Sequence, residues 1–404
     1  MAIDSPAIDL LSAASFAAGQ PWDQFRWLRE HDPVHFHPEP DGPGFWALTR
    51  HDDVRAVGRD PVLFSSAPTI MIADAPGEVT VPDHAMMLMQ DPPGHTVQRK
   101  IVHRDFIPRA AEALRPRIRE LAAEIIDGVA GRERFDLVED VAGLMPSYVI
   151  AELLGIPHAD GVALYKLTEA IHSVPDGSPA EGEEPPGTAA VREMLGYAHT
   201  VWEEKRARPT DDLCGKVING HLGHRPVDEI DFGLFFLLLI DAGGDTTRNL
   251  VSGGMHALFR HPEATAAIRA DLDGTLKPTI EEMLRWVSPV IYMRRTATAD
   301  TELRGRTIRA GDKVVMYYGA ANRDPEVFAD PDRFDPARSP NHHVAFGGGG
   351  PHYCLGSHVA RVEIEELLRE LLTRLPHLAP GGPVTWLSSN FISGPKHLPV
   401  HNPA

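Results

Sequence analysis

The segment from Phe346 to Gly356 reads FGGGGPHYCLG and holds a residue type well suited to bind a metal. Cys354, one of only two cysteines in the chain, follows a run of glycines and directly precedes a helical pattern that begins at Ser357. The first N–H groups of a helix have no partner within the helix, so they favour a thiolate over a thiol. A lone thiolate in this position is suited to hold iron, although a small buried cysteine beside an ordinary glycine turn is the simpler alternative.

A second group of polar residues interrupts an apolar segment, Phe232 to Gly254, which reads FGLFFLLLIDAGGDTTRNLVSGG. Its first half has no polar face, which predicts a helix that is buried on all sides. Gly243 and Gly244 each weaken such a helix by roughly 0.5–1 kcal/mol relative to Ala, so they need a packing or functional reason. Asp245 and Thr246 bring an acid and a hydroxyl into the buried segment. Close packing against a neighbouring helix, with Thr246 donating to a backbone carbonyl, would also explain this composition.

A third motif is EEMLRW, which ends at Trp286. Glu282 and Arg285 are three residues apart on a helix and can form an ion pair. Thr279 and Glu282 also match a capping box, and Glu281 could pair with Arg285 instead. Surface pairs of this kind contribute about 0–1 kcal/mol, so the spacing alone does not assign a role.

In this order the motifs closely resemble those of the cytochrome P450 enzymes, the haem-thiolate monooxygenases, over nearly all of the chain. The resemblance implies that Cys354 is the axial ligand of the haem iron and that Asp245 and Thr246 are catalytic. In the family an arginine from a segment such as PDRFDP joins the ExxR pair. Glu282, Arg285 and Arg333 match that triad, which would hold the loop that leads to Cys354.

The resemblance implies haem b (iron protoporphyrin IX), whose carboxylates need cationic partners. The matching candidates are His95 and Arg99, which are four residues apart and share one helix face, with Arg295 and His352. Arg295 is preferred over Arg294 because its distance to the following TATAD fits the family better. Further residues at the matching cofactor-binding positions are Phe346, Gly349, Gly356, Ala242 and Gly243.

The implied reaction is O2-dependent hydroxylation of a hydrophobic small molecule, such as a steroid, lipid, terpenoid or aromatic-like compound. The thiolate favours heterolysis of the O–O bond, which also requires protons. Thr246 would hold an ordered water, and Asp245 would relay protons from solvent. A peroxide-driven peroxygenase is an alternative, although related peroxygenases usually replace this acid and alcohol. A non-catalytic haem-based ligand-binding protein is a third candidate, which the intact relay motif disfavours.

The substrate class is predicted from one difference between this chain and the usual family pattern, and from the residues at the family's pocket positions. The interval from Phe346 to Cys354 is one residue longer than usual, as in a bacterial subset that oxidises sterols, branched lipids and related apolar molecules. The pocket residues are predicted to be mainly apolar, which suits a ligand held by shape. They are Met71, Met86, Met89, Leu238, Val290, Ile291, Phe391 and Ile392.

Charge and composition indicate the partners. The net charge of -18 argues against binding to nucleic acid or to an anionic membrane. A locally basic stretch would steer an acidic ferredoxin, itself reduced by an NAD(P)H-dependent reductase, toward the cysteine side of the haem. It comprises Arg99, Lys100, Arg104, Arg109, Arg115, Arg117 and Arg119, although a solvated helix face is its default interpretation. No flavin or nicotinamide domain is visible in the sequence.

The expected fold is mainly α with small β-sheets, a triangular prism with a long central helix over the haem. Helical patterns dominate to about Arg285, and strand-like segments such as YMRRTATAD and DKVVMYYG follow. Residues 1–404 are expected to form a single cytochrome P450 domain. The two widely separated cysteines and the acidic, interrupted N-terminus predict a cytoplasmic protein. Leu234 to Ile240 is too short to span a membrane, which takes roughly 20 residues, so no membrane anchor is expected.

Overall fold

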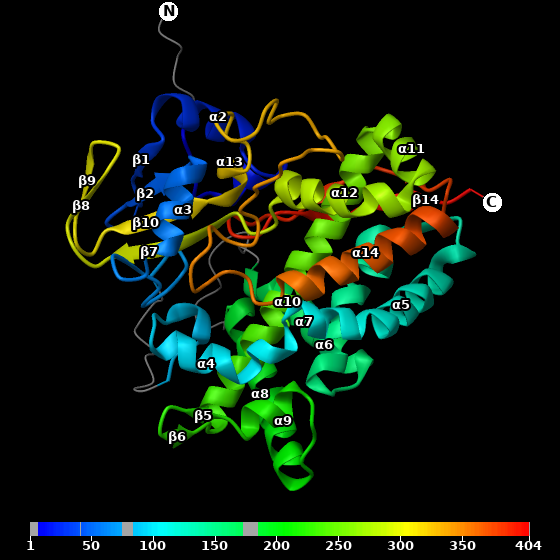
Figure 1. Ribbon diagram of the computed structural model, residues 1–404, viewed down its shortest axis with the longest axis horizontal. Helices are drawn as coiled ribbons and strands as arrows, with labels where there is room; N and C mark the ends of the chain where they lie inside the picture. The colour runs from blue at the N-terminus through cyan, green and yellow to red at the C-terminus, as the bar shows by residue number, and fades with distance from the viewer. Residues whose placement is uncertain (1–6, 41, 75–83, 173–184, 404) are drawn as a thin grey trace, which may run out of the picture.

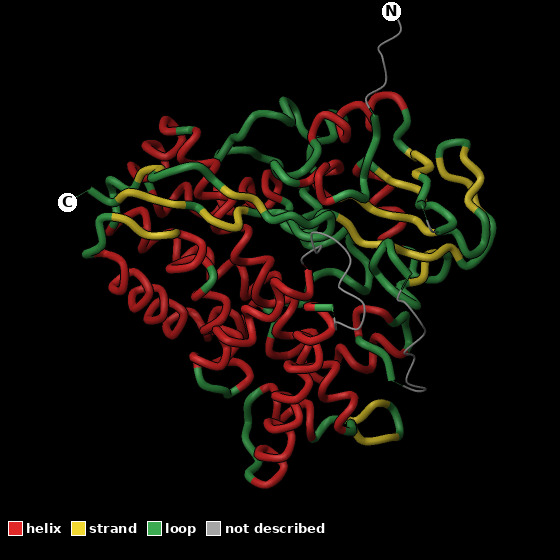
Figure 2. Tube along the Cα trace, turned by 180° about the vertical axis from the view of Figure 1, so that it is seen from behind, coloured by secondary structure: helices red, strands yellow, loops and turns green. Residues whose placement is uncertain are grey.

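The computed structural model describes residues 7–40, 42–74, 84–172 and 185–403. Its outline is triangular, with a helical body and a smaller region of strands at one corner (Figures 1 and 2). The predicted mainly α fold with small sheets is therefore confirmed.

The helices make up most of the body of the molecule. They are α1 (Ala13–Phe16), α2 (Trp22–His31), α3 (His51–Arg59), α4 (Gly94–Val102), α5 (Pro108–Ala130), α6 (Leu144–Leu154), α7 (His158–His172), α8 (Pro186–Ala207), α9 (Leu213–Ile218), α10 (Glu229–Arg260), α11 (Pro262–Ala270), α12 (Leu272–Val287), α13 (Tyr318–Ala321) and α14 (Ser357–Arg374). Short 3-10 turns lie at Met87–Met89 and His103–Asp105, and a π-helical turn lies at Val138–Ala142.

The strands are short and belong to one larger sheet and several small ones. They are β1 (Val34–His37), β2 (Phe45–Leu48), β3 (Phe64–Ser65), β4 (Arg134–Asp136), β5 (His221–Leu222), β6 (Arg225–Pro226), β7 (Tyr292–Ala297), β8 (Thr301–Leu303), β9 (Arg306–Ile308), β10 (Lys313–Tyr317), β11 (Ala379–Pro380), β12 (Thr385–Trp386), β13 (Pro395–His397) and β14 (Pro399–His401). The larger sheet has the order β1-β2-β10-β7-β3.

The central strand of that sheet, β10, is buried along its whole length. It pairs in parallel with β2 and antiparallel with β7, where Val314 lies opposite Arg295. Because successive side chains of a strand point to opposite faces, Arg294 and Arg295 are directed to different sides of the sheet. This alternation determines which of the two arginines reaches the candidate site.

Helix α10 runs through the middle of the helical body (Figure 1), as the apolar segment predicts. It begins with a capping box in which the side chains of Asp228 and Asp231 each accept from the other's backbone N–H. A Cβ on Gly244 would lie 2.9 Å from the ring of Tyr165 on α7. Close packing against a neighbouring helix is therefore a sufficient reason for glycine at this position.

Helix α14 begins at Ser357, directly after the cysteine loop, and packs along α5 (Figure 1). Its Glu363 is only 6% exposed, and Oε2 has no hydrogen-bond partner among the described residues. Burial raises the pKa of Glu363 to about 8. The side chain is therefore protonated near neutral pH, because ionising it away from water is unfavourable.

Replacing Glu363 by Gln is expected to remove one source of alkaline destabilisation. The ordinary pKa of the group is 4.5, so between pH 4.5 and about 8 the unfolded state is ionised while the folded state keeps its proton. Unfolding then releases a proton, and the free energy of unfolding falls as the pH rises through this window. Thermal denaturation should show that the stability of Glu363→Gln relative to the wild type increases between pH 5 and 8 and is constant at higher pH. A constant difference across this range would contradict the assignment.

Both cysteines are free thiols. Cys214 is buried, and burial raises the pKa of its thiol to about 12. Cys354 is half-buried. Within the described ranges, no helix is both long enough and apolar enough to cross a membrane.

Candidate active site

The loop that carries Cys354 turns sharply on its glycines. Gly347, Gly349 and Gly350 have φ values of 97°, 101° and 79°, which L side chains rarely adopt. The N–H of Cys354 donates to the carbonyl of Phe346 at 3.0 Å and closes the loop. The turn predicted from the glycine run is therefore present.

The glycines have a second partner, which sequence reasoning did not identify. A Cβ on Gly348 would lie 2.7 Å from the carbonyl oxygen of Val54, and one on Gly350 would lie 2.3 Å from that of Gly58. The loop thus lies directly against the backbone of α3. Sequence reasoning expected close approach to a flat cofactor, but in the structure Gly348 and Gly350 are required by contact with this helix.

The electrostatic surroundings of Cys354 do not by themselves ionise it. Burial raises the pKa of the thiol. The N–H groups of Gly356 and Ser357 at the start of α14 oppose this effect, as do the guanidinium groups of Arg99 and Arg361, but the pKa stays above its ordinary value. The helix N-terminus predicted to favour a thiolate is present, and a bound cation would supply the remaining stabilisation.

Four predicted basic side chains come together beside this loop. The rings of His95 on α4 and His352 lie 4.2 Å apart between centroids. Arg99 donates through Nη2 to the carbonyl of Tyr353 at 2.7 Å. Arg295 is 4% exposed and acts electrostatically on both imidazoles. Its neighbour Arg294 points to the opposite face and forms an ion pair with Asp74 at 2.5 Å, so the structure brings Arg295 and not Arg294 to the group.

The four bases lack an anion of their own. Burial, together with the neighbouring arginines, lowers the pKa of His95 to about 4 and that of His352 to about 3. His95 Nδ1 is buried and has no hydrogen-bond partner among the described residues. The nearby carboxylate, Asp91, already accepts hydrogen bonds from Ser65 and Ser66. A dianionic group placed here would offset the repulsion among the positive charges and would accept hydrogen bonds that the buried side chains lack. These residues therefore fit the carboxylates of a haem.

The acid and the alcohol predicted on α10 lie next to a residue of that helix that is exposed. Ala242 is exposed although most of its neighbours on α10 are buried. Thr246 donates through Oγ1 to the carbonyl of Ala242 at 3.0 Å, the backbone bond expected from a purely structural role. Asp245 is 3% exposed, and its Oδ1 lies 3.6 Å from Nη1 of Arg248. Burial raises the pKa of Asp245 to about 6, against the lowering effect of Arg248 and His172.

The ion-pair triad has a different third member from the one predicted. Glu282 accepts from Nε and Nη2 of Arg285, each at 2.7 Å, and both side chains are fully buried. The other cation at Glu282 is Arg338, whose Nε lies 3.2 Å from Oε2. The assignment of Arg333 was wrong, because its side chain is exposed and only its carbonyl accepts from Arg285, at 3.1 Å. The adjacent Phe334 is 4% exposed and turns inward, which directs Arg333 outward.

This network reaches the start of the cysteine loop. Asn341 donates to Glu282 at 3.1 Å, and His343 Nε2 lies 2.9 Å from a carboxylate oxygen of Glu281. Glu281 also accepts two hydrogen bonds from Arg361 of α14, at 2.6 and 2.9 Å. The open alternative in which Glu281 pairs with Arg285 is therefore not observed. The two adjacent acids instead attach the segment before the loop and the helix after it to α12.

The predicted pocket residues fall into two groups. Val290 forms an isolated β-bridge with Ile392, and the N–H of Ile291 donates to the carbonyl of Phe391 at 2.9 Å. Met71 and Met89 pack against this group, while Leu238 belongs to the core of the helical body and Met86 packs against that core. Ile291 is 0% exposed. It is therefore part of the core in this structure, and its role as a lining residue stays a prediction.

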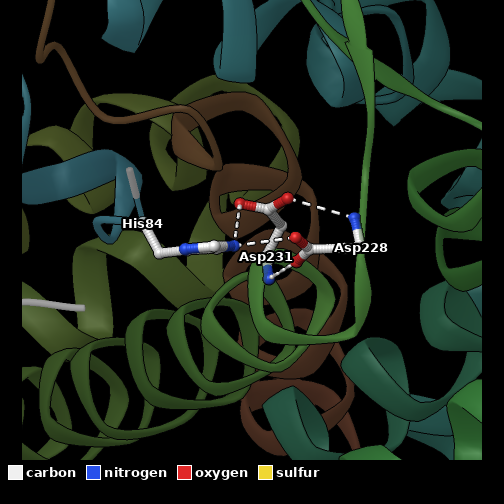
Figure 3. A group of neighbouring side chains, drawn as sticks. All are labelled: His84, Asp228 and Asp231. Atoms are coloured by element: carbon white, nitrogen blue, oxygen red, sulfur yellow. Dashed lines mark hydrogen bonds and ion pairs between the residues drawn. The ribbon is translucent and has the colours of Figure 1, made fainter. Parts of the chain in front are cut away.

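Figure 3 shows a histidine and acid group that sequence reasoning missed. His84 Nε2 lies 2.8 Å from Asp228 Oδ2 and 3.9 Å from Asp231 Oδ1, a geometry that could hold a metal ion. The carboxylates are already engaged, since both cap α10 and Asp231 accepts from Nη2 of Arg225 at 2.9 Å. We therefore assign the group to fixing the start of α10. His84 is 144 residues from Asp228 in sequence, so no local motif signals the group.

Comparison with known proteins gives one consistent result. A family model described as cytochrome P450 matches residues 229–385. The chain is 38% identical over 386 residues to a methyl-branched lipid omega-hydroxylase of Mycobacterium tuberculosis, covering 93% of this chain and 90% of that protein. It is 35% identical over 402 residues to a steroid C26-monooxygenase of Mycolicibacterium smegmatis, covering 97% and 93%. A solved cytochrome P450 of Mycobacterium marinum, in complex with pseudoionone, is 36% identical with a TM-score of 0.91, covering 99% and 100%.

Proposed function

Because the chain belongs to the cytochrome P450 family of haem-thiolate monooxygenases, we propose that it hydroxylates a hydrophobic small molecule with O2, taking electrons from NAD(P)H through a ferredoxin reductase and a ferredoxin. The observation that carries the proposal is the position of Cys354 beside four basic side chains that have no anion among them. The membership of an enzyme family overturns the non-catalytic alternative.

The proposed cofactor is haem b. When bound, a thiolate-ligated haem supplies electron density that favours heterolysis of an O–O bond. Cys354 would hold the iron, and His95, Arg99, Arg295 and His352 would bind the carboxylates. The residues proposed to border the macrocycle are Phe346, Gly349 and Gly356 of the loop, with Ala242 and Gly243 of α10.

Asp245 and Thr246 are proposed to deliver protons to the reacting oxygen. A pKa of about 6 lets the carboxyl of Asp245 take up and release a proton near neutral pH, which is the condition for efficient proton transfer. The Thr246 hydroxyl donates to the Ala242 carbonyl at 3.0 Å and retains lone pairs that can accept a hydrogen bond. It can therefore orient a water while its own hydrogen is held by the helix.

The proposed substrate is an extended apolar molecule of the lipid or steroid class. The relatives' names specify a methyl-branched lipid and a steroid. The candidate pocket residues Val290, Phe391, Ile392, Met71 and Met89 are all apolar, which suits recognition by shape. A screen of methyl-branched fatty acids and steroids for a shift of the haem spin state, followed by product analysis, tests this class. Binding restricted to polar ligands would contradict it.

Peroxide-supported turnover separates the proposal from the peroxygenase alternative. The same substrate would be offered with either ferredoxin, reductase and NAD(P)H or with hydrogen peroxide alone. The retained Asp245 and Thr246 favour much faster product formation with the electron-transfer proteins. Faster turnover with peroxide would favour the alternative.

The proposal also includes a cytoplasmic location, where reducing conditions keep Cys354 a free thiol.

The ferredoxin is proposed to dock beside α4 and the following turn. The basic stretch predicted for this role is only partly available, because much of it is neutralised by acids of the same chain. Arg115 and Arg119 bind Glu366 of α14, and Arg117 binds Glu120 and Glu152. Lys100, Arg104 and Arg109 are exposed and make no ion pair with any described residue. These three are the cations left to attract an acidic partner.

Replacing Lys100, Arg104 and Arg109 together by Gln is expected to raise the KM for ferredoxin roughly 10-fold or more at low salt, since charged patches mainly accelerate association. The rate with saturating ferredoxin should change little. Arg117→Gln is the matched control, because that arginine is also exposed but already paired with two carboxylates. An equal rise in KM for both variants would refute this docking surface.

A further inference from the structure

A small cavity lies between α7, α10 and the segment around residue 389 near the C-terminus. About 20 Å³ of it is open to the centre of a water molecule, which is room for one water. Its polar lining consists of Glu169 and His172 from α7, Asp245 and Arg248 from α10, and the serines Ser388 and Ser389. The cavity is thus bordered by the acid proposed to deliver protons and by titratable groups to which no role has been assigned.

Asp245 lines this cavity and has one carboxylate oxygen that accepts no hydrogen bond from the described residues, although that oxygen lies 3.6 Å from Nη1 of Arg248. The residue is 3% exposed, and its Oδ1 has no hydrogen-bond partner among the described residues. A buried carboxylate oxygen without a hydrogen bond is unfavourable, so such an oxygen is normally satisfied by ordered water. The cavity offers the space for that water, with other polar groups around it.

An ion pair stands between the cavity and solvent. His172 Nε2 lies 2.6 Å from Oδ1 of Asp241, and the side chains are 11% and 27% exposed. Asp241 and Asp245 are four residues apart on α10, so they lie on the same face one turn apart. His172 also lines the cavity. The imidazole therefore joins a partly exposed acid on one side to the cavity on the other.

The other cation beside the cavity is unsuited to move protons. Arg248 is fully buried, lies 2.5 Å from Oε1 of Glu169, and binds the hydroxyl of Tyr165. A guanidinium holds its proton throughout the physiological pH range, so Arg248 supplies a fixed charge. The charged groups that face His172 are then Asp241, Asp245 and Arg248 of α10 and Glu169 of its own helix, while Ser388 and Ser389 are uncharged.

We propose that His172, paired with Asp241, passes protons from solvent to Asp245 through a water molecule held in this cavity. In one passage the protonated imidazole of His172 gives a proton to the water, the water gives one of its protons to the Asp245 carboxylate, and the imidazole nitrogen that lost its proton takes up another from solvent. Each N–H or O–H bond that breaks is matched by one that forms, and the Asp241 carboxylate offsets the positive charge of the imidazole. His172 does not touch the reacting atoms and acts through Asp245. This inference rests on the proposed function, which needs protons at Thr246.

The protonation equilibria of the groups suit this transfer. Burial lowers the pKa of His172, but Asp241 and the nearby Asp245 outweigh it, so the pKa lies above its ordinary value of 6.5. The pKa of Asp245 is about 6, and the positive charge of His172 helps to keep it from rising further. The imidazole of His172 is therefore held in its charged form more strongly than an ordinary histidine, while Asp245 changes protonation near neutral pH.

The test compares His172→Gln with His199→Gln. Gln can keep a hydrogen bond to Asp241 but cannot titrate. His199 is the matched control, because its Nδ1 lies 2.6 Å from Glu229 on the same helix α10 but outside the cavity. His172→Gln should lower product per NAD(P)H roughly 10-fold and should remove a pH-dependent step from its profile, since proton delivery by one group contributes about 10²–10⁴ in rate and water can partly replace a relay. His199→Gln should match the wild type.

A second readout does not require turnover. Infrared titration of the resting protein, with Asp245→Asn to assign the band, should show the carboxyl of Asp245 titrating at higher pH in His172→Gln and unchanged in His199→Gln. Asp241→Asn, at a partly exposed position, should reproduce the coupling defect if His172→Gln does not fold. An unchanged pH profile together with an unchanged Asp245 titration would overturn the proposal. If the wild type forms no product at all, the proposed function fails, while the infrared titration still reports on the link between His172 and Asp245.

Discussion

Asp245→Asn is expected to slow NAD(P)H-dependent turnover by about 100-fold or more, while Thr246→Ala is expected to keep consuming NAD(P)H and to release peroxide in place of product. The two variants differ because Asn cannot carry a proton, whereas loss of the Thr246 hydroxyl removes only the group that orients water. Both measurements come from one assay that follows NAD(P)H, product and peroxide together.

Ser252→Ala is the matched control for the hydroxyl. Ser252 lies on the same helix and donates to the carbonyl of Arg248 at 2.8 Å, as Thr246 donates to that of Ala242. If the defect of Thr246→Ala came only from the lost backbone hydrogen bond, Ser252→Ala would show it too. An unchanged ratio of product to NAD(P)H in Thr246→Ala would remove Thr246 from the proposed site.

Arg285→Ala is expected to lower the free energy of unfolding by about 3–5 kcal/mol, because it leaves the carboxylate of Glu282 buried with only part of its partners. It also frees the carbonyls of Asn322 and Pro331, which accept from Arg285 at 2.9 and 2.8 Å. Denaturant titration measures the change.

The exposed Arg333 provides the control for this prediction. Arg333→Ala should change the free energy of unfolding by no more than about 0.5 kcal/mol, as is usual for surface positions. Arg338→Ala should lie between the two, since Arg338 is only one of the cations around Glu282. Equal losses for Arg333→Ala and Arg285→Ala would restore Arg333 to the triad.

Local patterns in the sequence were sufficient to predict the two helices that carry the site. The apolar run before Asp245 predicted the buried helix α10, and the 3.6-residue period after Cys354 predicted α14. They failed where a choice depended on side-chain direction. Arg333 and Arg338 are five residues apart in one loop, and only the structure shows that Arg338 contacts Glu282 while Arg333 is exposed.

Contacts between segments that are distant in the chain could not be predicted from the sequence. Glycines in the cysteine loop lie against α3, and Glu366 of α14, which neutralises Arg115 and Arg119, is 251 and 247 residues away from them in sequence. His172 and Asp241 are 69 residues apart, and His172 lies in no motif. Composition therefore overestimated the free positive charge of α5 and gave no sign of the outer proton donor.

The most direct test of the central claim is the reduced carbon monoxide difference spectrum of the purified protein, with Cys354→Ser beside it. The wild type should give the spectrum of thiolate-ligated haem. Cys354→Ser should lose that spectrum even if it still contains haem. A wild type that binds haem but gives the spectrum of a nitrogen-ligated iron, or a Cys354→Ser variant that keeps the thiolate spectrum, would contradict the assignment of Cys354 as the iron ligand.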